Sequence, residues 1–449
     1  MSQLPKGWVN LALGDLCSKL TDGSHNPPKA KESGLPMLSA KNIQNGKLHF
    51  GLGSRLISED EFIVEDKRTR ISQGDVLLTI VGALGRAAVV TTPEKFTLQR
   101  SVAVLHAPLV SPFFLKYSFE SPAFQKQVFD NAKGTAQKGI YLKKLRELSI
   151  SLPSAAEQTR IVEKLDEVLA QVDTIKARLD GIPAILKRFR QSVLAAAVSG
   201  KLTDEWRGGS CFVAKEYTLQ DLTHMDIGHA FKSKEFSETG IPLLRGQNIE
   251  PGALRWVDTK FFPEDKLTSH RKLFIEEGDI ILAMDRPIVS AGLKLARAKK
   301  SDLPCVLVQR VARIRTNDLA IDDYIYLLLK DASFSDYLVP NQTGSDIPHI
   351  SGKQIQAYQI AIPALEEQKE IVRLVDQYFA FADTIEAQVK KAQARVDKLT
   401  QSILAKAFRG ELVPQDPNDE PADKLLERIA LARKEAEALA KAAKKAAKK

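Results

Sequence analysis

The chain has 449 residues, of which 44% are hydrophobic, and its three cysteines are isolated, which excludes a disulfide framework and a cysteine metal cluster. The tail from Asp423 to Lys449 holds +5 of the +9 net charge, so the bulk charge alone does not indicate nucleic-acid binding. The longest apolar run, from Val76 to Gly85, is far shorter than the ~20 residues of a membrane span and no signal peptide is evident, so we expect a cytoplasmic protein that does not contact a membrane.

The first part of the chain predicts a strand-rich globular domain. Gly74-Asp75 precedes a run of Val, Leu and Ile, which is typical of a turn that leads into a buried strand. Asn45-Gly46 is a strong signal for a turn between two short strands. Residues 111–129 carry Phe, Leu and Tyr at helical spacing and predict short helices on this domain.

A long helix follows, because apolar residues recur at alternating steps of four and three from Ile161 to Val193. This heptad pattern is typical of a helix that packs along its whole length against another helix. We expect Ser154 as the N-cap of the helix and Gly200 as its left-handed end. Gly181-Ile182-Pro183 interrupts the pattern, and we expect a kink or a break near residues 180–184.

The second half of the chain, residues 207–410, repeats the plan of residues 1–200. Gly34-Leu35-Pro36 matches Gly240-Ile241-Pro242 at an offset of 206, and Gly74-Asp75 matches Gly278-Asp279 at 204. Gln99-Arg100 matches Gln309-Arg310 at 210, and the same offset continues through the second long helix. The predicted seam of the helix pair consists of Ile161, Leu165, Val168, Val172, Ile175, Leu179, Ile371, Val375, Tyr378, Ile385, Val389 and Val396.

The repeat predicts an α+β protein of two strand-rich domains in a pseudo-two-fold arrangement, separated by two long coiled-coil helices. The expected segments are an N-terminal domain (1–153), a long-helix spacer (154–206), a C-terminal domain (207–363), a second long-helix spacer (364–410), and a C-terminal loop with a helical tail rich in Lys and Ala (411–449). Because the helices have kept one offset while the domains have not, we expect that helix length matters to the function.

The motifs that would indicate catalysis all fail at the residue that carries the chemistry. Asn26-Pro27-Pro28 begins like an amino-methyltransferase motif, but Lys29 stands where an aromatic residue is needed to stack on a base. The segment Gly134 to Gly139 has the glycines of a phosphate-binding loop, but Ile140 replaces the required lysine. We therefore predict no catalytic residues, no metal ligands and no bound cofactor.

Polar loops broken by glycine occupy matching places in both halves. Arg, Lys, Asn and Gln read base edges, and glycine lets the backbone approach phosphate. The candidate DNA-binding residues are Thr21, Asp22, Ser24, His25, Lys41, Asn42, Arg86, Gln137, Lys138 and Tyr141 in the first half, and Arg245, Gln247, Asn248, Asp285, Arg286, Ser345 and His349 in the second. Gln99-Arg100 and Gln309-Arg310 lie beside apolar strands, and a structural role for them stays open.

The helix from Glu163 to Asp173, the segment from Ile185 to Leu194, and the ending Gly410-Glu411-Leu412-Val413 resemble specificity subunits of type I restriction–modification enzymes. Ile362-Pro363 with Glu366-Glu367-Gln368 resembles the helix entry of that family.

This resemblance implies a non-catalytic subunit in which each domain is a target recognition domain that reads one half of a split, asymmetric site in double-stranded DNA. The two long helices would pack antiparallel, fix the spacer between the half-sites and dock two methyltransferase subunits. Restriction subunits that translocate and cut DNA would complete the complex. S-adenosylmethionine, ATP and Mg²⁺ would be bound by those partners, in the cytoplasm of a bacterium or archaeon.

Two other functions stay open from the sequence. The chain could be a self-contained methyltransferase or nuclease, which would show turnover without partners. It could also be a coiled-coil adaptor that binds only proteins, which would give no sequence preference in a gel shift with its partner present.

Overall fold

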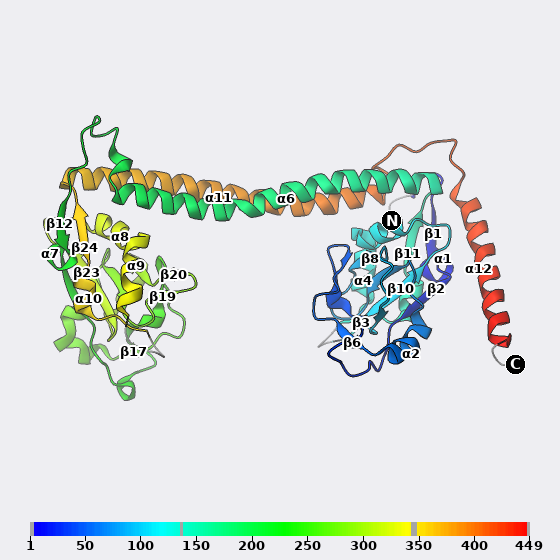
Figure 1. Cartoon of the computed structure of the whole chain (residues 1–449), viewed down its shortest axis with the longest axis horizontal. Helices are drawn as coiled ribbons and strands as arrows, with labels where there is room; N and C mark the ends of the chain where they lie inside the picture. Colours follow the sequence, from blue (N-terminus) through cyan, green and yellow to red (C-terminus); the bar gives the residue numbers. More distant parts are fainter. Residues whose placement is uncertain (1–3, 135–137, 343–347, 447–449) are drawn as a thin grey trace. The chain divides into compact units, whose positions relative to one another are not determined.

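The computed structural model describes residues 4–134, 138–342 and 348–446 (Figure 1). The chain divides into two compact units, residues 1–180 with 391–449, and residues 181–390. Each unit contains one globular domain and one half of each long helix, so the two units repeat one plan, as the sequence predicts. No helix in the described ranges is long and apolar enough to cross a membrane.

The first unit contains the N-terminal domain. Its strands are β1 (Val9–Ala12), β2 (Lys19–Asp22), β3 (Leu35–Leu38), β4 (Ile43–Gln44), β5 (Lys47–Leu48), β6 (Arg55–Ile57), β7 (Val76–Thr79), β8 (Ala87–Val89), β9 (Thr97–Leu98), β10 (Val102–His106) and β11 (Ser149–Leu152). Its helices are α1 (Leu13–Leu16), α2 (Glu59–Thr69), α3 (Pro112–Glu120), α4 (Pro122–Asn131) and α5 (Leu142–Glu147).

The second unit contains the C-terminal domain. Its strands are β12 (Lys215–Thr218), β13 (Thr223–Ile227), β14 (Ile241–Leu244), β15 (Ile249–Glu250), β16 (Ala253–Leu254), β17 (Phe261–Phe262), β18 (Ile280–Ala283), β19 (Ile288–Val289), β20 (Gly292–Leu293), β21 (Leu295–Arg297), β22 (Val306–Leu307), β23 (Val311–Thr316) and β24 (Gln359–Ile362). Its helices are α7 (Leu219–Leu222), α8 (Asp322–Lys330), α9 (Ala332–Asn341) and α10 (Gly352–Gln356).

A four-stranded antiparallel sheet is the centre of each domain, ordered β2-β10-β7-β8 in the first and β13-β23-β18-β21 in the second. In β7, Val76 and Leu78 pack into the core beneath α3 and α4, while Leu77 packs into a separate core on the other face. Since both faces are covered, the strand is apolar without alternation. The three-stranded sheets β6-β3-β9 and β17-β14-β22 lie beside these central sheets.

The Gly-Asp turn before each central strand holds a buried carboxylate. In the first unit, Asp75 is fully buried and pairs with Lys19 Nζ at 2.5 Å and with His106 Nδ1 at 3.1 Å. Burial acts to raise the pKa of Asp75, but hydrogen bonds from His106, Lys19 and the Ser72 N–H outweigh it, so that this pKa is lowered. In the second unit, Asp279 pairs instead with Arg315, whose Nη2 donates at 2.8 Å.

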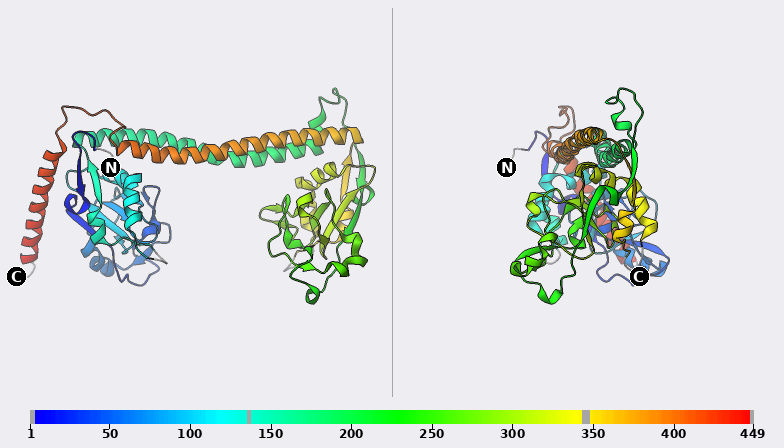
Figure 2. Two further views of the ribbon diagram at one scale, coloured as in Figure 1. Left: turned by 180° about the vertical axis from the view of Figure 1, so that it is seen from behind. Right: turned by 90° about the vertical axis from the view of Figure 1, so that its left-hand side faces the viewer.

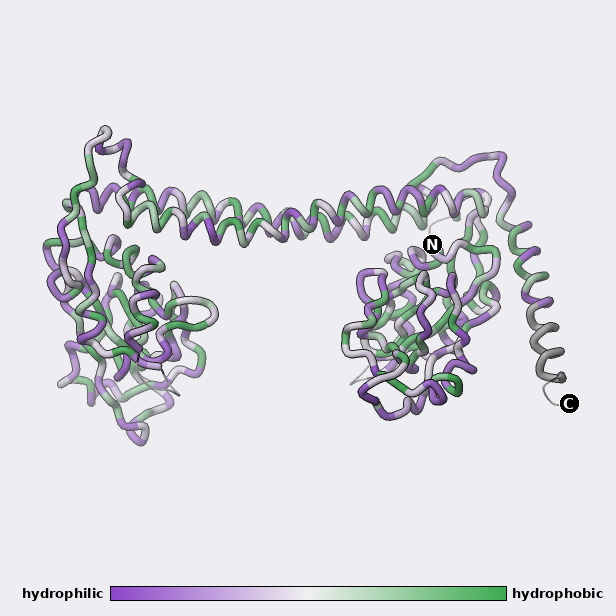
Figure 3. The backbone as a smooth tube through the Cα atoms, viewed as in Figure 1, coloured by the Kyte–Doolittle hydropathy of each residue, from purple (hydrophilic) through white to green (hydrophobic). Residues whose placement is uncertain are grey.

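Two long helices complete the units, α6 (Ala155–Val198) and α11 (Leu365–Ala407), and hydrophobic residues alternate with hydrophilic ones along both (Figure 3). In the first unit, Lys176 pairs with Asp397 at 2.8 Å; in the second, Arg190 pairs with Asp383. A second pair in each unit gives the direction: Asp180 bonds to Gln393 in the first unit, and Thr203, just after α6, bonds to Glu367 in the second. Because one partner's number rises as the other's falls within each unit, the helices are antiparallel there, as predicted. Helix α12 (Ala422–Ala446) packs Leu425 and Ile429 into the core of the N-terminal domain beside α1 (Figures 1 and 2).

Two predictions about the long helices need correction. Helix α6 is continuous through Pro183, so the predicted break is wrong, and a kink at residues 180–184 stays a prediction. Pro183 lies on an exposed part of the helix, while Leu186, three residues further on, is buried. The helix therefore continues in spite of the ~3 kcal/mol that an interior proline costs. Ile175 is 46% exposed rather than buried in the seam. Tyr378 is 41% exposed, but its ring still packs edge-to-face against Phe189 of α6, with the ring centroids 6.1 Å apart. A helix of 3.6 residues per turn drifts from a 3.5-residue repeat, which moves such positions off the contact face.

The entry of each long helix is held by a buried glutamine, and the sequence singled out only the second of them, Gln368. Gln158 and Gln368 are fully buried, and each accepts a backbone N–H from the loop that precedes α3 or α8, Ser111 or Ile321. Ser154 caps α6 by accepting the Glu157 N–H at 3.0 Å, as predicted. The helices end before Gly200 and Gly410, whose φ values of +72° and +71° confirm the predicted left-handed ends.

Candidate nucleic-acid interface

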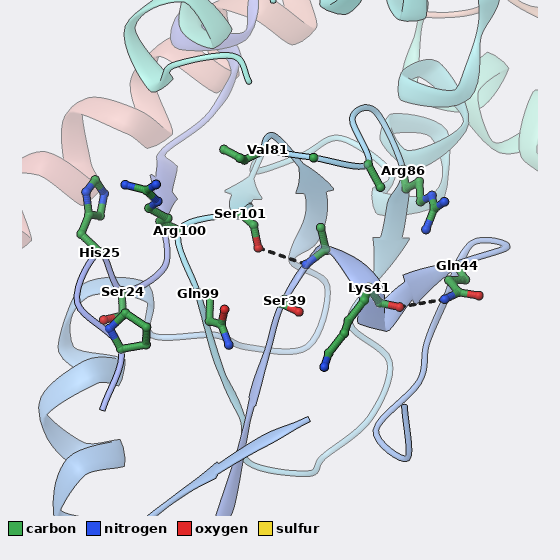
Figure 4. A pocket seen from close by; sticks show the side chains of 14 residues that line it. Ser24, His25, Ser39, Lys41, Gln44, Val81, Arg86, Gln99, Arg100 and Ser101 are labelled. Atoms are coloured by element: carbon green, nitrogen blue, oxygen red, sulfur yellow. Dashed lines mark hydrogen bonds between the residues drawn. The ribbon is translucent and has the colours of Figure 1, made fainter. Parts of the chain in front are cut away.

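Loops from both sheets of the N-terminal domain enclose an open hollow of about 500 Å³ (Figure 4). Four of the predicted residues line it: Ser24, His25, Lys41 and Arg86. Gln99, Arg100 and Ser101 line it as well, although their apolar neighbours left their role open in the sequence. The hollow therefore joins segments that are up to 77 positions apart in the chain.

The hollow is electropositive. Lys41, Arg86 and Arg100 are exposed, and no carboxylate in the described ranges lies within ion-pairing distance of them. A concavity lined by charges of one sign concentrates the electric field and attracts counter-ions, so three cations around this hollow suit an anionic ligand. The drawing of the hollow shows Lys41 and Arg86 on one side and Arg100 beside His25 on the other (Figure 4).

The backbone around the hollow is fixed where two segments of the chain, at Gly23-Ser24 and at residues 98–100, cross in close contact. The Ser24 N–H donates to Leu98 O at 2.7 Å, and the Arg100 N–H donates to Ser24 O at 2.9 Å. A Cβ on Gly23 would lie 2.1 Å from Leu98 O, so only glycine fits. The second domain repeats this crossing at Gly228, where a Cβ would lie 2.3 Å from Val308.

Two predicted DNA contacts are structural residues instead. Asn42 and Asn248 have no exposed surface. The side-chain oxygen of Asn42 accepts the Ser39 N–H at 2.9 Å, and its nitrogen donates to His49 O at 3.0 Å. Asn248 makes the same two bonds, to the Arg245 N–H and Arg255 O. Each asparagine holds the loop from inside, so its side chain is not available to DNA.

The other predicted residues of the first half lie around the hollow. Asp22 is buried in β2 and binds His25 Nε2 at 2.9 Å and the guanidinium of Arg68, which orients His25. Thr21 precedes it in the same strand. Lys138 lies beside the hollow because its carbonyl accepts the Gly82 N–H, and Tyr141 is 75% exposed at the start of α5. Gln137 lies outside the described residues.

The predicted residues of the second half also converge. Asp285 forms a bridge with His349, and its carboxylate lies 3.8 Å from Arg310 Nε. Arg286 follows with φ +44°, and Gln247 is exposed beside Arg245. Burial lowers the pKa of Arg245, whose Nη2 donates to Asp258 O at 2.7 Å. Ser345 lies outside the described residues.

The hydrogen bonds correct one match between the halves. The Ile80 N–H donates to Ser101 O, and its counterpart, the Met284 N–H, donates to Arg310 O. The Arg100 and Gln309 N–H groups donate to Ser24 O and His229 O, respectively. Arg100 thus corresponds to Gln309, and Ser101 to Arg310. The repeated Gln-Arg pair is offset by one residue in space, so its two copies are not equivalent.

One cation of the second half was missed by the sequence comparison. Lys294 is partly buried, and its Nζ lies 4.0 Å from the position of a Cβ on Gly246, in the loop that also holds Gln247. Burial lowers the pKa of Lys294; Asp285 opposes this shift and Arg286 adds to it. The loop between β18 and β21 is longer than its counterpart between β7 and β8, so Lys294 does not align with a residue of the first half in the sequence.

Among the residues with described positions, no three His, Cys, Asp or Glu side chains are close enough together to hold a metal ion.

Known proteins with similar sequences share the duplicated plan of this chain. A family model described as "Type I restriction modification DNA specificity domain" matches residues 5–184 and 214–393. The chain is 32% identical to the type I restriction enzyme EcoKI specificity subunit of Escherichia coli (strain K12), over 100% of this chain and 99% of that protein. It is 30% identical to the StySPI specificity subunit of Salmonella potsdam, over 92% and 91%.

Solved structures show the same fold. A chain from a structure titled "Structural basis underlying complex assembly and conformational transition of the type I R-M system" matches with a TM-score of 0.61 at 20% identity, covering 92% of this chain and 100% of that one. The HsdS subunit from Thermoanaerobacter tengcongensis matches with a TM-score of 0.58 at 21% identity, covering 91% and 98%.

Proposed function

Because the chain belongs to the specificity subunits of type I restriction–modification enzymes, we propose that each of its two recognition domains reads one half of an asymmetric, bipartite site in double-stranded DNA. The observation that carries this proposal is the hollow with three unpaired cations, Lys41, Arg86 and Arg100. Cations of this kind contact phosphates and base edges. The C-terminal domain supports it with a different set of side chains at the matching loops, as two different half-sites require.

The specificity subunit recognises DNA and leaves catalysis to its partners. S-adenosylmethionine, ATP and Mg²⁺ would accordingly be bound by modification and restriction subunits. The purified chain alone, given labelled S-adenosylmethionine or Mg²⁺, should neither methylate nor cut DNA. Turnover that stays with this chain through purification would contradict this division of labour.

The paired helices α6 and α11 would set the spacer between the half-sites. The support is their unbroken length and their continuous pairing within each unit. A seven-residue heptad inserted into both helices should lengthen the preferred spacer and leave the half-sites unchanged. Sequencing of methylated sites in cells that carry wild-type or lengthened chains measures both at once, and an unchanged spacer would contradict the proposal.

Two methyltransferase subunits would dock on the helices, one for each unit. Large apolar side chains are exposed on the helices of both units: Leu399 is 47% exposed in the first, and Phe381 is 59% exposed in the second. Isolated exposed apolar residues are ordinary, so the support here is only that each helix pair carries a large one, at positions that are not equivalent in the repeat.

Native mass spectrometry of the complex tests this stoichiometry. The wild-type chain should bind two methyltransferase subunits, and Leu399→Asp and Phe381→Asp should each lose one of them. Gln388→Asp, at an exposed polar position of α11, is the matched control and should keep both. A one-to-one complex of the wild-type chain would contradict the proposal.

A further inference from the structure

The cations of the two recognition domains stand at different positions of the same loops. Where the first domain has Lys41 and Arg100, the second has Gln247 and Gln309. Conversely, Arg245, Arg286 and Arg310 of the second domain take the places of Ser39, Gly82 and Ser101. These exchanges are what two surfaces that read different sequences should show.

One position keeps its positive charge in both domains. The Thr79 N–H donates to Arg86 O at 2.9 Å, and its counterpart, the Ala283 N–H, donates to Lys294 O at 3.0 Å. Arg86 and Lys294 each stand directly before the strand that pairs with β7 or β18, namely β8 or β21. Arg86 and Lys294 therefore occupy equivalent positions of the two domains, although the sequences around them do not align.

The surroundings of Lys294 suit an anion. No carboxylate in the described part of the chain lies within ion-pairing distance of its ammonium group; Asp285 attracts this group from further away and Arg286 repels it. The group is also partly withdrawn from water, which makes an unpaired charge costly. A bound anion would remove that cost. Arg86 is exposed, but it likewise has no carboxylate within ion-pairing distance in the described part of the chain, and it lines the N-terminal hollow (Figure 4).

We propose that Arg86 and Lys294 make one shared, sequence-independent contact, each to a phosphate of the DNA backbone in its own half-site, while the cations that differ between the domains contribute to sequence choice. The proposal rests on the function proposed above. Two half-sites of different sequence present the same phosphate backbone but different bases. The exchange of Arg for Lys also fits a phosphate, since a point charge suffices there, whereas bidentate recognition of guanine depends on the fork of arginine.

The test measures binding of the full chain, in complex with its methyltransferase subunits, to a duplex with the methylated site and to a scrambled duplex, between about 50 and 200 mM salt. Arg86→Gln and Lys294→Gln should each weaken binding to both duplexes by the same factor. Each should also lower the slope of log K against log salt by about 0.9, the value for one phosphate contact. The methylated sequence should not change, and Arg86→Lys and Lys294→Arg should keep wild-type affinity.

Arg100→Gln and Arg310→Ser are matched controls, since each places the residue of one domain at the same position of the other. They should change the preferred bases in one half-site only. The inference is overturned if Lys294→Gln or Arg86→Gln alters the methylated sequence, or if both leave affinity and salt slope unchanged. A wild-type complex without any sequence preference would instead contradict the proposed function, so the two failures are distinguishable.

Discussion

The two recognition domains differ on the surface and agree inside. Both place an asparagine under the same loop, a glycine at the same chain crossing and an aspartate before the same central strand. Only the partners of the aspartate have changed, from Lys19 and His106 to Arg315. In the surface loops, most charged residues stand at different positions in the two domains. The interior contacts thus define the fold, and the surface positions are free to define the target.

Glycine at the chain crossing should be the most sensitive point of either domain. Gly23→Ala would force a Cβ against Leu98 O, and we expect a loss of about 3 kcal/mol or more in the free energy of unfolding. Hydrogen exchange measured by mass spectrometry should show the loss in the N-terminal domain only, and Gly228→Ala should show it in the C-terminal domain only.

Gly51→Ala is the control for this pair, because nothing lies within 4 Å of its added Cβ. It should leave protection unchanged. Equal loss of protection in both domains after Gly23→Ala would show that they do not unfold separately.

Substitution of the buried asparagines should have the next largest effect on stability. Asn42→Ala leaves the Ser39 N–H and His49 O without their partner, which should cost about 2 kcal/mol. Asn248→Ala should cost a similar amount in its own domain. Urea unfolding measures the change. A variant that keeps full stability but loses DNA binding would restore Asn42 as a direct contact.

Asp75→Asn should cost about 2 kcal/mol at neutral pH, because it removes the charge that Lys19 and His106 bind. Since the folded protein lowers the pKa of Asp75, its contribution is complete above the unfolded pKa of about 3.9 and is lost as the pH falls through the folded value. The gap between wild type and Asp75→Asn in urea unfolding should therefore close at acid pH. A gap that persists there would rule out this charge as its source.

The smallest effect is expected on the helix surface. Lys176→Ala removes an exposed ion pair with Asp397, and such pairs contribute less than about 1 kcal/mol. Thermal unfolding should change by little, and the small change should vanish in high salt. A large loss would mean that the helix pair depends on charges more than on its buried seam.

The sequence predicted the duplication and the long helices because these depend on periodic apolar residues and on local signals, whereas the antiparallel pairing was implied by the family resemblance. Gln368 was recognised only as part of a motif and Gln158 was not singled out, because the contact of each with a distant loop required the structure. Among the site residues, composition could not separate Lys41, which is exposed, from Asn42, which is buried beside it. Lys294 was missed because a loop of changed length hid its match with Arg86.

The buried asparagine also bears on how such a protein changes its target over generations. Asn42 and Asn248 carry the hydrogen bonds of the loop, while their neighbours Lys41 and Gln247 are exposed. A substitution at the neighbour therefore alters the surface without a penalty in folding. In each of these loops, a residue that is free to change stands next to one that the fold requires. New DNA specificities can therefore arise through variants that still fold.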